Sequence, residues 1–306
     1  MSISAIVRRL LQALVVLLAT YTLAFFLLSA LPSDGVLARY ASPDLALSLE
    51  ELTAIRDSYG ADEPLWRQYF SSLAGFLSGD FGYSVRTGAS VTSMIAQALP
   101  GTLVLAAVAF VLAVVLAALI AAAAWFVKGA GALPSLMVSV PSFWIGIIII
   151  QVVSFQLGWI PVIEPTSAQA LVLPALTLSI PIAAPLAQVL VRALEQARGE
   201  PFVRVVRARG ASQWWVLARH VARIAALPAV TMAGLLFGEL VGGAVVTEAV
   251  FARQGLGQLT VDAVANRDTP VLLAVVLITA TTYVLINLIV DVAYPLLDAR
   301  LRRKVH

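Results

Sequence analysis

Residues 101–125 read GTLVLAAVAFVLAVVLAALIAAAAW, a stretch without a single charged side chain. A helix needs about 20 apolar residues to cross the hydrocarbon core of a bilayer, so this stretch is long enough to span one. Similar apolar runs occupy roughly residues 10–31, 134–158, 171–191, 225–248 and 271–294. Their apolar residues are continuous rather than alternating with polar ones, which indicates helices and not barrel strands. The sequence therefore predicts an all-α integral membrane protein with six transmembrane helices.

The composition agrees with this class and excludes several kinds of chemistry. Of 306 residues, 60% are hydrophobic and 12% are charged, and the absence of cysteine rules out disulfides, thiolate nucleophiles and cysteine metal sites. No Gly-x-x-x-x-Gly-Lys-Ser/Thr motif is present, so the sequence predicts no ATP site of that kind. The glycines of GLG at 255–257 are interpreted as a turn. The net charge of +3 requires no nucleic-acid partner, because basic residues of the inner segments account for it.

The distribution of Lys and Arg predicts that both termini are cytoplasmic. With that orientation the inner segments 1–9, 126–133, 192–224 and 296–306 hold 2, 1, 7 and 4 basic residues, 14 of the chain's 20. Both histidines, His220 and His306, then lie on the inner side, which leaves no histidine for a metal or catalytic centre inside the bundle. A cleavable signal peptide at the Arg8-Arg9 end remains an alternative for the first apolar run.

Residues 32–100 form the one long segment on the opposite side, and we expect it to be helical. Ser48 and Glu51 have capping-box spacing ahead of a helix that ends near Gly60, and Pro64 precedes a second helix. In the second helix four apolar residues share one face, which predicts packing on the membrane surface or on the ends of the spans. They are Leu65, Tyr69, Leu73 and Phe76. A loop without structure is the alternative.

Three features inside the predicted spans are candidates for packing or function. The fourth span contains Pro174, Pro181 and Pro185, and a proline inside a helix leaves a backbone carbonyl without its hydrogen bond. Such carbonyls either line a polar path or lie in a kink that packs against neighbouring helices. The fifth span carries Gly234, Gly238 and Gly242 at four-residue spacing, which predicts close approach of another helix. Acidic residues at membrane depth are expensive, so we expect Glu239, near the bilayer centre, to face the bundle interior. Glu248 and Asp291 are the other two acids at membrane depth.

Residues 200–224, EPFVRVVRARGASQWWVLARHVARI, form a basic insertion between two apolar spans. We predict two short helices that break at Gly210, the second capped by Ser212. The second would place its apolar residues on one face and its basic residues on the other. The apolar set is Trp214, Leu217, Ala218 and Val221, and the basic set is Arg219, His220 and Arg223. Such an amphipathic hairpin suits docking into a protein groove or onto anionic headgroups.

This insertion resembles the cytoplasmic coupling loop of permeases of binding-protein-dependent ABC importers, in their dipeptide/oligopeptide/nickel branch. The residues that carry the resemblance are Arg207-Ala208-Arg209-Gly210, Ser212, Arg219-His220 and Leu227-Pro228. The general signature of the family begins Glu-Ala-Ala, where this chain has Arg204-Val205-Val206. Seven more stretches resemble these permeases in the same order along nearly the whole chain. They are GDFGYSVRTG (79–88), LPGTLVL (99–105), VPSFWIG (140–146), LGWIPV (157–162), FARQGLG (251–257), NRDTPV (266–271) and NLIVDVAYPLLDARLR (287–302).

The resemblance implies a type I ABC importer permease in the bacterial inner membrane. Residues 1–306 would form one permease domain, with 32–100 as its extracytoplasmic segment and 194–224 as its coupling loop. A second homologous permease, two cytoplasmic ATPase subunits or domains, an extracytoplasmic solute-binding protein and a peptide substrate would be its partners. ATP and Mg would bind to the ATPase subunits, so this chain would hold no cofactor or metal and catalyse no reaction.

The resemblance assigns candidate residues to the coupling loop, and residues of the predicted spans are the candidates for a translocation path. The coupling loop would use Arg204, Arg207, Arg209, Gly210, Ser212, Trp214, Trp215, Arg219, His220 and Arg223. The translocation path would be lined by Pro141, Trp144, Pro181, Pro185, Glu239 and Asp291. Two other classes stay open from the sequence. An ion- or proton-coupled transporter would use Glu239, Glu248 and Asp291 as coupling sites, and a structural membrane scaffold would use none of them.

Overall fold

A computed structural model of the protein describes residues 3–30, 50–51, 53–54, 63–127, 129–163 and 165–297, with side chains between 7 and 290. The chain divides into two compact units. Residues 103–251 and those from 285 onward belong to the first unit, and residues 2–102 and 252–284 belong to the second unit. The long helices α5 (Val91–Phe126) and α13 (Thr269–Leu297) each contribute residues to both.

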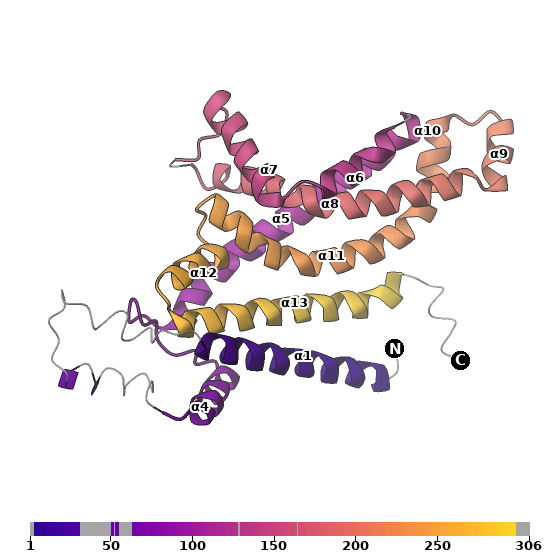
Figure 1. Cartoon of the computed structure of the whole chain (residues 1–306). Helices are drawn as coiled ribbons and strands as arrows, with labels where there is room; N and C mark the ends of the chain where they lie inside the picture. The colour runs from indigo at the N-terminus through magenta and orange to yellow at the C-terminus, as the bar shows by residue number, and fades with distance from the viewer. Residues whose placement is uncertain are drawn as a thin grey trace. The chain divides into compact units, whose positions relative to one another are not determined.

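Five helical stretches are long and apolar enough to cross a membrane (Figure 1). They comprise α1 (Ile3–Ser29), α5, α8 (Gln169–Arg198), the stretch Gln213–Val250 that ends in α11 (Ala222–Val250), and α13. The number rises to six if the bent pair of helices between α5 and α8 is one span. The prediction of an all-α membrane protein is thereby confirmed.

The third predicted span is not one straight helix, so the expectation of a continuous helix over 134–158 is wrong. The short 3-10 turn η2 (Ala130–Ala132) leads into α6 (Leu133–Val138), and α7 (Ser142–Ile149) continues as a π-helix, η3 (Ile150–Gln156). The two halves are bent by 103°. The break lies at Pro141, which has φ −61° and ψ 136°, because proline removes a backbone donor and disfavours helix in the residue before it.

The first unit is built around α8, with α11 packed along it (Figure 1). Small residues allow this close packing: a Cβ on Gly243 would lie 3.1 Å from Leu178, and one on Gly146 of α7 would lie 3.2 Å from Thr177. The helix α8 runs unbroken through Pro174, Pro181 and Pro185. The three prolines of the fourth predicted span therefore lie inside one continuous helix, and this helix contributes many residues to the core of the first unit.

The second unit contains α4 (Leu65–Ser78) and α12 (Leu256–Ala265) together with parts of α1, α5 and α13. Tyr69, Leu73 and Phe76 of α4 pack against Tyr21 and Phe25 of α1, and the Tyr21 hydroxyl donates to the Tyr69 carbonyl oxygen at 2.7 Å. The predicted apolar face of this helix is thus correct for three of its four residues. Leu65 is 52% exposed, because it lies at the first turn, beyond the cluster.

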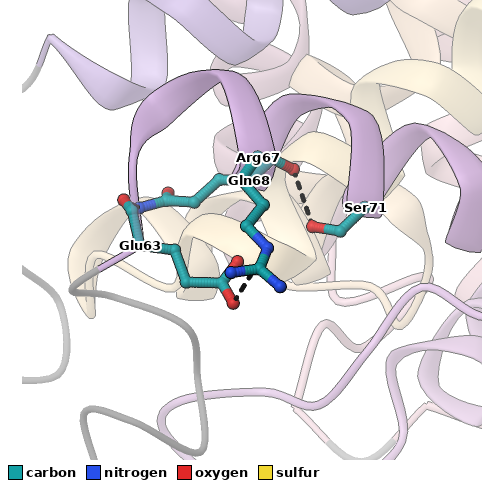
Figure 2. Close-up of polar contacts among 4 residues, drawn as sticks. All are labelled: Glu63, Arg67, Gln68 and Ser71. Carbon is teal, nitrogen blue, oxygen red and sulfur yellow. Dashed lines mark hydrogen bonds and ion pairs between the residues drawn. The ribbon is translucent and has the colours of Figure 1, made fainter.

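The first turn of α4 is held by polar contacts (Figure 2). Arg67 Nε lies 3.8 Å from Glu63 Oε1, Gln68 donates through Nε2 to the Glu63 carbonyl at 2.8 Å, and Ser71 donates to the Gln68 carbonyl at 3.1 Å (Figure 2). The helix starts directly after Pro64, as predicted. The preceding helix that the sequence predicts, from the capping box to Gly60, falls mostly outside the described residues.

Candidate functional site

The basic insertion folds as two helical pieces joined by a tight turn. The first piece is α9 (Pro201–Ala208), and Gly210 follows it with a φ of +87°, a conformation that glycine adopts without steric cost. The second piece begins with α10 (Gln213–Val216), where the Ser212 hydroxyl accepts a hydrogen bond from the Trp215 amide at 3.2 Å. The predicted break at Gly210 and the predicted Ser212 cap are both confirmed.

The second piece is not a separate short helix, which corrects the expected hairpin. The chain continues from α10 through a π-helical turn, η4 (Leu217–Val221), directly into α11. The buried residues are Val216, Leu217 and Val221, whereas Trp214 is 62% exposed and Ala218 is also exposed. The predicted apolar face is therefore partly wrong, because a π turn accommodates an extra residue and shifts the register that a 3.6-residue period assumes.

Residues 201–221 are called the coupling segment here, after the loop that their sequence resembles, and their buried side is part of the core of the first unit. Val203 of α9 clusters with Val216, Val221, Trp125 of α5 and Leu194 of α8. The Arg198 guanidinium lies over the Trp125 ring, 4.8 Å from its centroid, and Nη1 donates to the Trp125 carbonyl at 3.3 Å. The coupling segment is thus packed directly onto the ends of α5 and α8.

The outward side of the coupling segment is basic and aromatic. Its exposed residues are Arg204, Arg207, Arg209, Trp214, Trp215 and Arg219, with Arg223 following at the start of α11. The centroids of the His220 and Trp215 rings are 4.8 Å apart, and His220 Nε2 is buried without a hydrogen-bond partner among the described residues. Exposed arginine and tryptophan are frequent anchors of protein interfaces, so this side has the chemistry of a docking surface for an acidic partner.

The candidate path residues do not form a closed site among the residues that the structure describes. Pro141 and Trp144 are exposed, and Pro181 and Pro185 are half-buried in α8. Glu239 is exposed on α11 in the single chain, so its position toward a bundle interior stays a prediction, and the described part of the chain buries Glu248. The side chain of Asp291 lies outside the described residues. Leu235, Glu239, Gly242 and Val246 are exposed at helical spacing, so this face of α11 is left uncovered.

The three glycines of α11 lie in different surroundings. A Cβ on Gly234 would lie 2.4 Å from Val290 Cγ1 of α13, so the predicted close approach exists there. Gly238 is buried, whereas a Cβ on Gly242 would meet no atom within 4 Å. The spacing therefore predicts one helix contact within the chain and leaves Gly242 on the open face.

A second constellation, which sequence reasoning missed, lies in the second unit. The Asp268 carboxylate accepts hydrogen bonds from the Ser84 hydroxyl, from the Val85 amide at 3.2 Å and from the Arg86 amide at 3.3 Å. Asp268 is only 2% exposed and Ser84 is fully buried. Stretches 79–88 and 266–271, both quoted for the family resemblance, are therefore joined by a buried carboxylate. One sequence alone carries no signal that pairs them.

A similar pairing joins stretches 99–105 and 251–257. The Thr102 hydroxyl accepts from the Leu256 amide at 2.9 Å, and Arg253 Nη1 donates to the Gly101 carbonyl at 3.0 Å. A Cβ on Gly101 would lie 3.0 Å from the Gln254 carbonyl oxygen, so only glycine allows this approach without a shift. In the described part of the chain, no group of three or more His, Cys, Asp or Glu residues could hold a metal ion.

Comparison with known proteins covers almost the entire chain. Residues 117–303 match the family described as binding-protein-dependent transport system inner membrane component, and residues 2–106 match the N-terminal family of the same components. The chain is 36% identical to the glutathione transport system permease protein GsiC of Escherichia coli (strain K12) over 305 residues, 98% of this chain and 99% of that protein. The protein of the same name from Shigella dysenteriae serotype 1 (strain Sd197) shows the same identity and coverage.

Proposed function

Since the chain belongs to the inner membrane components of binding-protein-dependent transport systems, we propose that it forms half of the solute path of a peptide importer. Its place as a multi-pass permease of an ABC importer follows from the family and from its apolar helices. We propose in addition a class of solute, the partner subunits and the residues that contact them. The observation that supports this proposal is that the chain aligns with 99% of the length of a permease relative.

The coupling segment 201–221 is the proposed contact with the ATPase subunits. Its inner side packs on α5 and α8, and its outer side presents arginines and tryptophans. ATP and Mg would bind to those subunits, and this chain would perform no catalysis itself. With the coupling segment on the cytoplasmic side, both termini are cytoplasmic and residues 32–100 are extracytoplasmic, as the distribution of Lys and Arg favours.

The open face of α11 is the proposed wall of the solute path. A carboxylate near the middle of the bilayer is costly against lipid, so Glu239 requires a polar or protein environment, which the described residues of this chain do not supply. A second permease that covers the outer part of this face would leave Glu239 beside the passing solute. Its charge would then favour a positive group, such as a peptide amino terminus.

The proposed solutes are short peptides, and the named relatives, glutathione permeases, support that class. The test uses the reconstituted complex with Glu239→Gln, which keeps the shape of the side chain and removes its charge. Uptake of a peptide with a free amino terminus should fall several-fold relative to an amino-blocked analogue. Equal loss for both peptides would refute the role of Glu239 in the path.

The transport mechanism has its own test in liposomes. The permease pair with ATPase subunits, ATP and binding protein should accumulate peptide, and omission of the ATPase subunits should abolish uptake. Uptake by this chain alone, driven by a proton or sodium gradient, would contradict the proposal.

A further inference from the structure

Arg267 occupies a backbone conformation that normally belongs to glycine. The helix α12 ends with two hydrogen bonds, from the Arg267 amide to the Val264 carbonyl at 3.2 Å and from the Asp268 amide to the Ala263 carbonyl at 2.8 Å. This pair of bonds defines a Schellman motif, in which the residue after the cap is left-handed and is usually glycine. Arg267 has that place with a φ of +53°.

An arginine at such a position is under backbone strain that a glycine would relieve. The Arg267 side chain is exposed and forms no ion pair or hydrogen bond with any residue that the structure describes. Within the described residues, its side chain therefore makes no polar contact that offsets the strain. A side chain kept under strain and directed to the exterior is a sign of a role in binding.

A second arginine, Arg86, has its backbone amide hydrogen-bonded to the carboxylate of Asp268. Asp268, the neighbour of Arg267, accepts the Arg86 amide, so the two backbones meet at one buried group. The Arg86 side chain is also exposed and makes no ion pair within the described residues. Exposed Tyr83, at 61%, lies on the same short loop. Two arginines and a tyrosine, residue types that dominate binding energy at interfaces, are thus exposed on the two segments that Asp268 joins.

The loop that carries Tyr83 and Arg86 is held by contacts within the second unit. Gly79, Gly82 and Gly88 have positive φ angles, Tyr83 and Ser90 form an antiparallel bridge, and the Ser84 side chain is fixed by Asp268. A surface that is ordered before binding loses little conformational entropy when a partner docks. The buried carboxylate would then serve to hold this loop in position.

We propose that Arg86 and Arg267, positioned by Asp268, are docking residues for an acidic surface of the extracytoplasmic solute-binding protein. The inference rests on the proposed function, which places this end of α13 outside the membrane. Charge complementarity favours an acidic partner, because both guanidinium groups are uncompensated in the described chain. Charges at the rim of an interface act mainly on the association rate and on its salt dependence.

The test measures the affinity of the binding protein for the complete transporter in nanodiscs, together with thermal stability. Arg267→Gly and Arg86→Gln should each raise the Kd of the binding protein by about tenfold and flatten its dependence on salt. Arg267→Gly should keep or raise the thermal midpoint, because it removes the left-handed arginine. A drop in the midpoint with unchanged affinity would show that Arg267 serves the fold and would overturn the proposal.

Two matched variants serve as controls. Ala252→Gly relieves the other left-handed residue found in the described chain, with φ +48°, and should change stability without changing the Kd. Arg67→Gln removes an exposed arginine of α4 that is paired with Glu63 (Figure 2), and it should leave the Kd unchanged. An equal loss of affinity with Arg67→Gln would mean that docking follows net charge alone, which contradicts a specific role for Arg86 and Arg267.

Other ligands of the two arginines give different results. If the two arginines bind anionic headgroups, the effect of both variants disappears in nanodiscs without anionic lipid. If they contact the solute, uptake falls while the Kd of the binding protein is unchanged. Either result overturns the inference alone, whereas a wild-type transporter whose ATPase activity ignores the binding protein would refute the proposed function itself.

Discussion

Gly234→Ala is the most direct test of the helix packing in the first unit. The added Cβ would lie 2.4 Å from Val290 Cγ1, about 1 Å closer than the 3.4 Å at which ordinary contact begins. The neighbour is a valine in a helix, which has one strongly preferred rotamer, so rotation cannot easily relieve the clash. Either Val290 leaves that rotamer or α11 and α13 move apart.

The expected cost can be isolated with a matched glycine on the same helix. Overpacking typically destabilises by about 1–3 kcal/mol, while replacing a helical glycine by alanine contributes up to about 1 kcal/mol of favourable propensity. Gly242→Ala meets no atom within 4 Å, so it should gain the propensity and suffer no clash. We expect Gly234→Ala to be less stable than Gly242→Ala by about 1–3 kcal/mol.

Unfolding of the purified subunit in mixed micelles, titrated with SDS and followed by tryptophan fluorescence, would measure this difference. Adding Val290→Ala to Gly234→Ala should recover stability, and a double-mutant cycle should give a coupling of about 1–3 kcal/mol. Equal stability of the two alanine variants, or the absence of coupling, would refute the packing argument.

Three further predictions concern single groups. Gly210→Ala and Gly210→Asp should uncouple ATP hydrolysis from transport, because the φ of +87° is unfavourable for a residue with a side chain, although space is open there. Gly210→Asn should retain more coupling, since asparagine tolerates this conformation. Wild-type stimulation of ATP hydrolysis by the binding protein in all three variants would contradict this prediction. Ser212→Ala should cost about 1 kcal/mol through the lost cap, seen as faster hydrogen exchange at Trp215, which Ser212→Asp should restore. Thr102→Val should leave the Leu256 amide unpaired and lower the stability of the second unit by about 1–3 kcal/mol. Limited proteolysis between residues 65 and 90 would measure this loss. An unchanged cleavage rate would count against a stabilising role for the hydrogen bond between Thr102 and Leu256.

Features that depend on local chemistry could be predicted from the sequence. The Ser212 cap, the turn at Gly210 and the start of α4 after Pro64 each depend on a few neighbouring residues. Long apolar runs identified the membrane helices because the bilayer sets their length. The exception was the break at Pro141, since hydropathy records how apolar a run is and not the direction of its backbone.

Features that depend on register or on distant partners could not be predicted. The π turn η4 shifts the buried face by one residue, and apolar periodicity assumes that no such turn is present. The pairing of Asp268 with Ser84 joins positions that are 184 residues apart, and no residue type in either stretch specifies the other. The surroundings of Glu239 are not set by the described chain alone, because it lies on the face of α11 that we propose a second permease covers.

The division of the second unit into two separate stretches has a consequence for biosynthesis. Residues 2–102 leave the ribosome first, but their partners in 252–284 follow only after the whole of 103–251 has been made. At roughly 5–20 residues per second this delay is about 7–30 s. Throughout that time Ser84 and Thr102, both fully buried in the finished protein, have no Asp268 or Leu256 to bond with. The second unit can therefore complete these buried contacts only after residues 252–284 have been made.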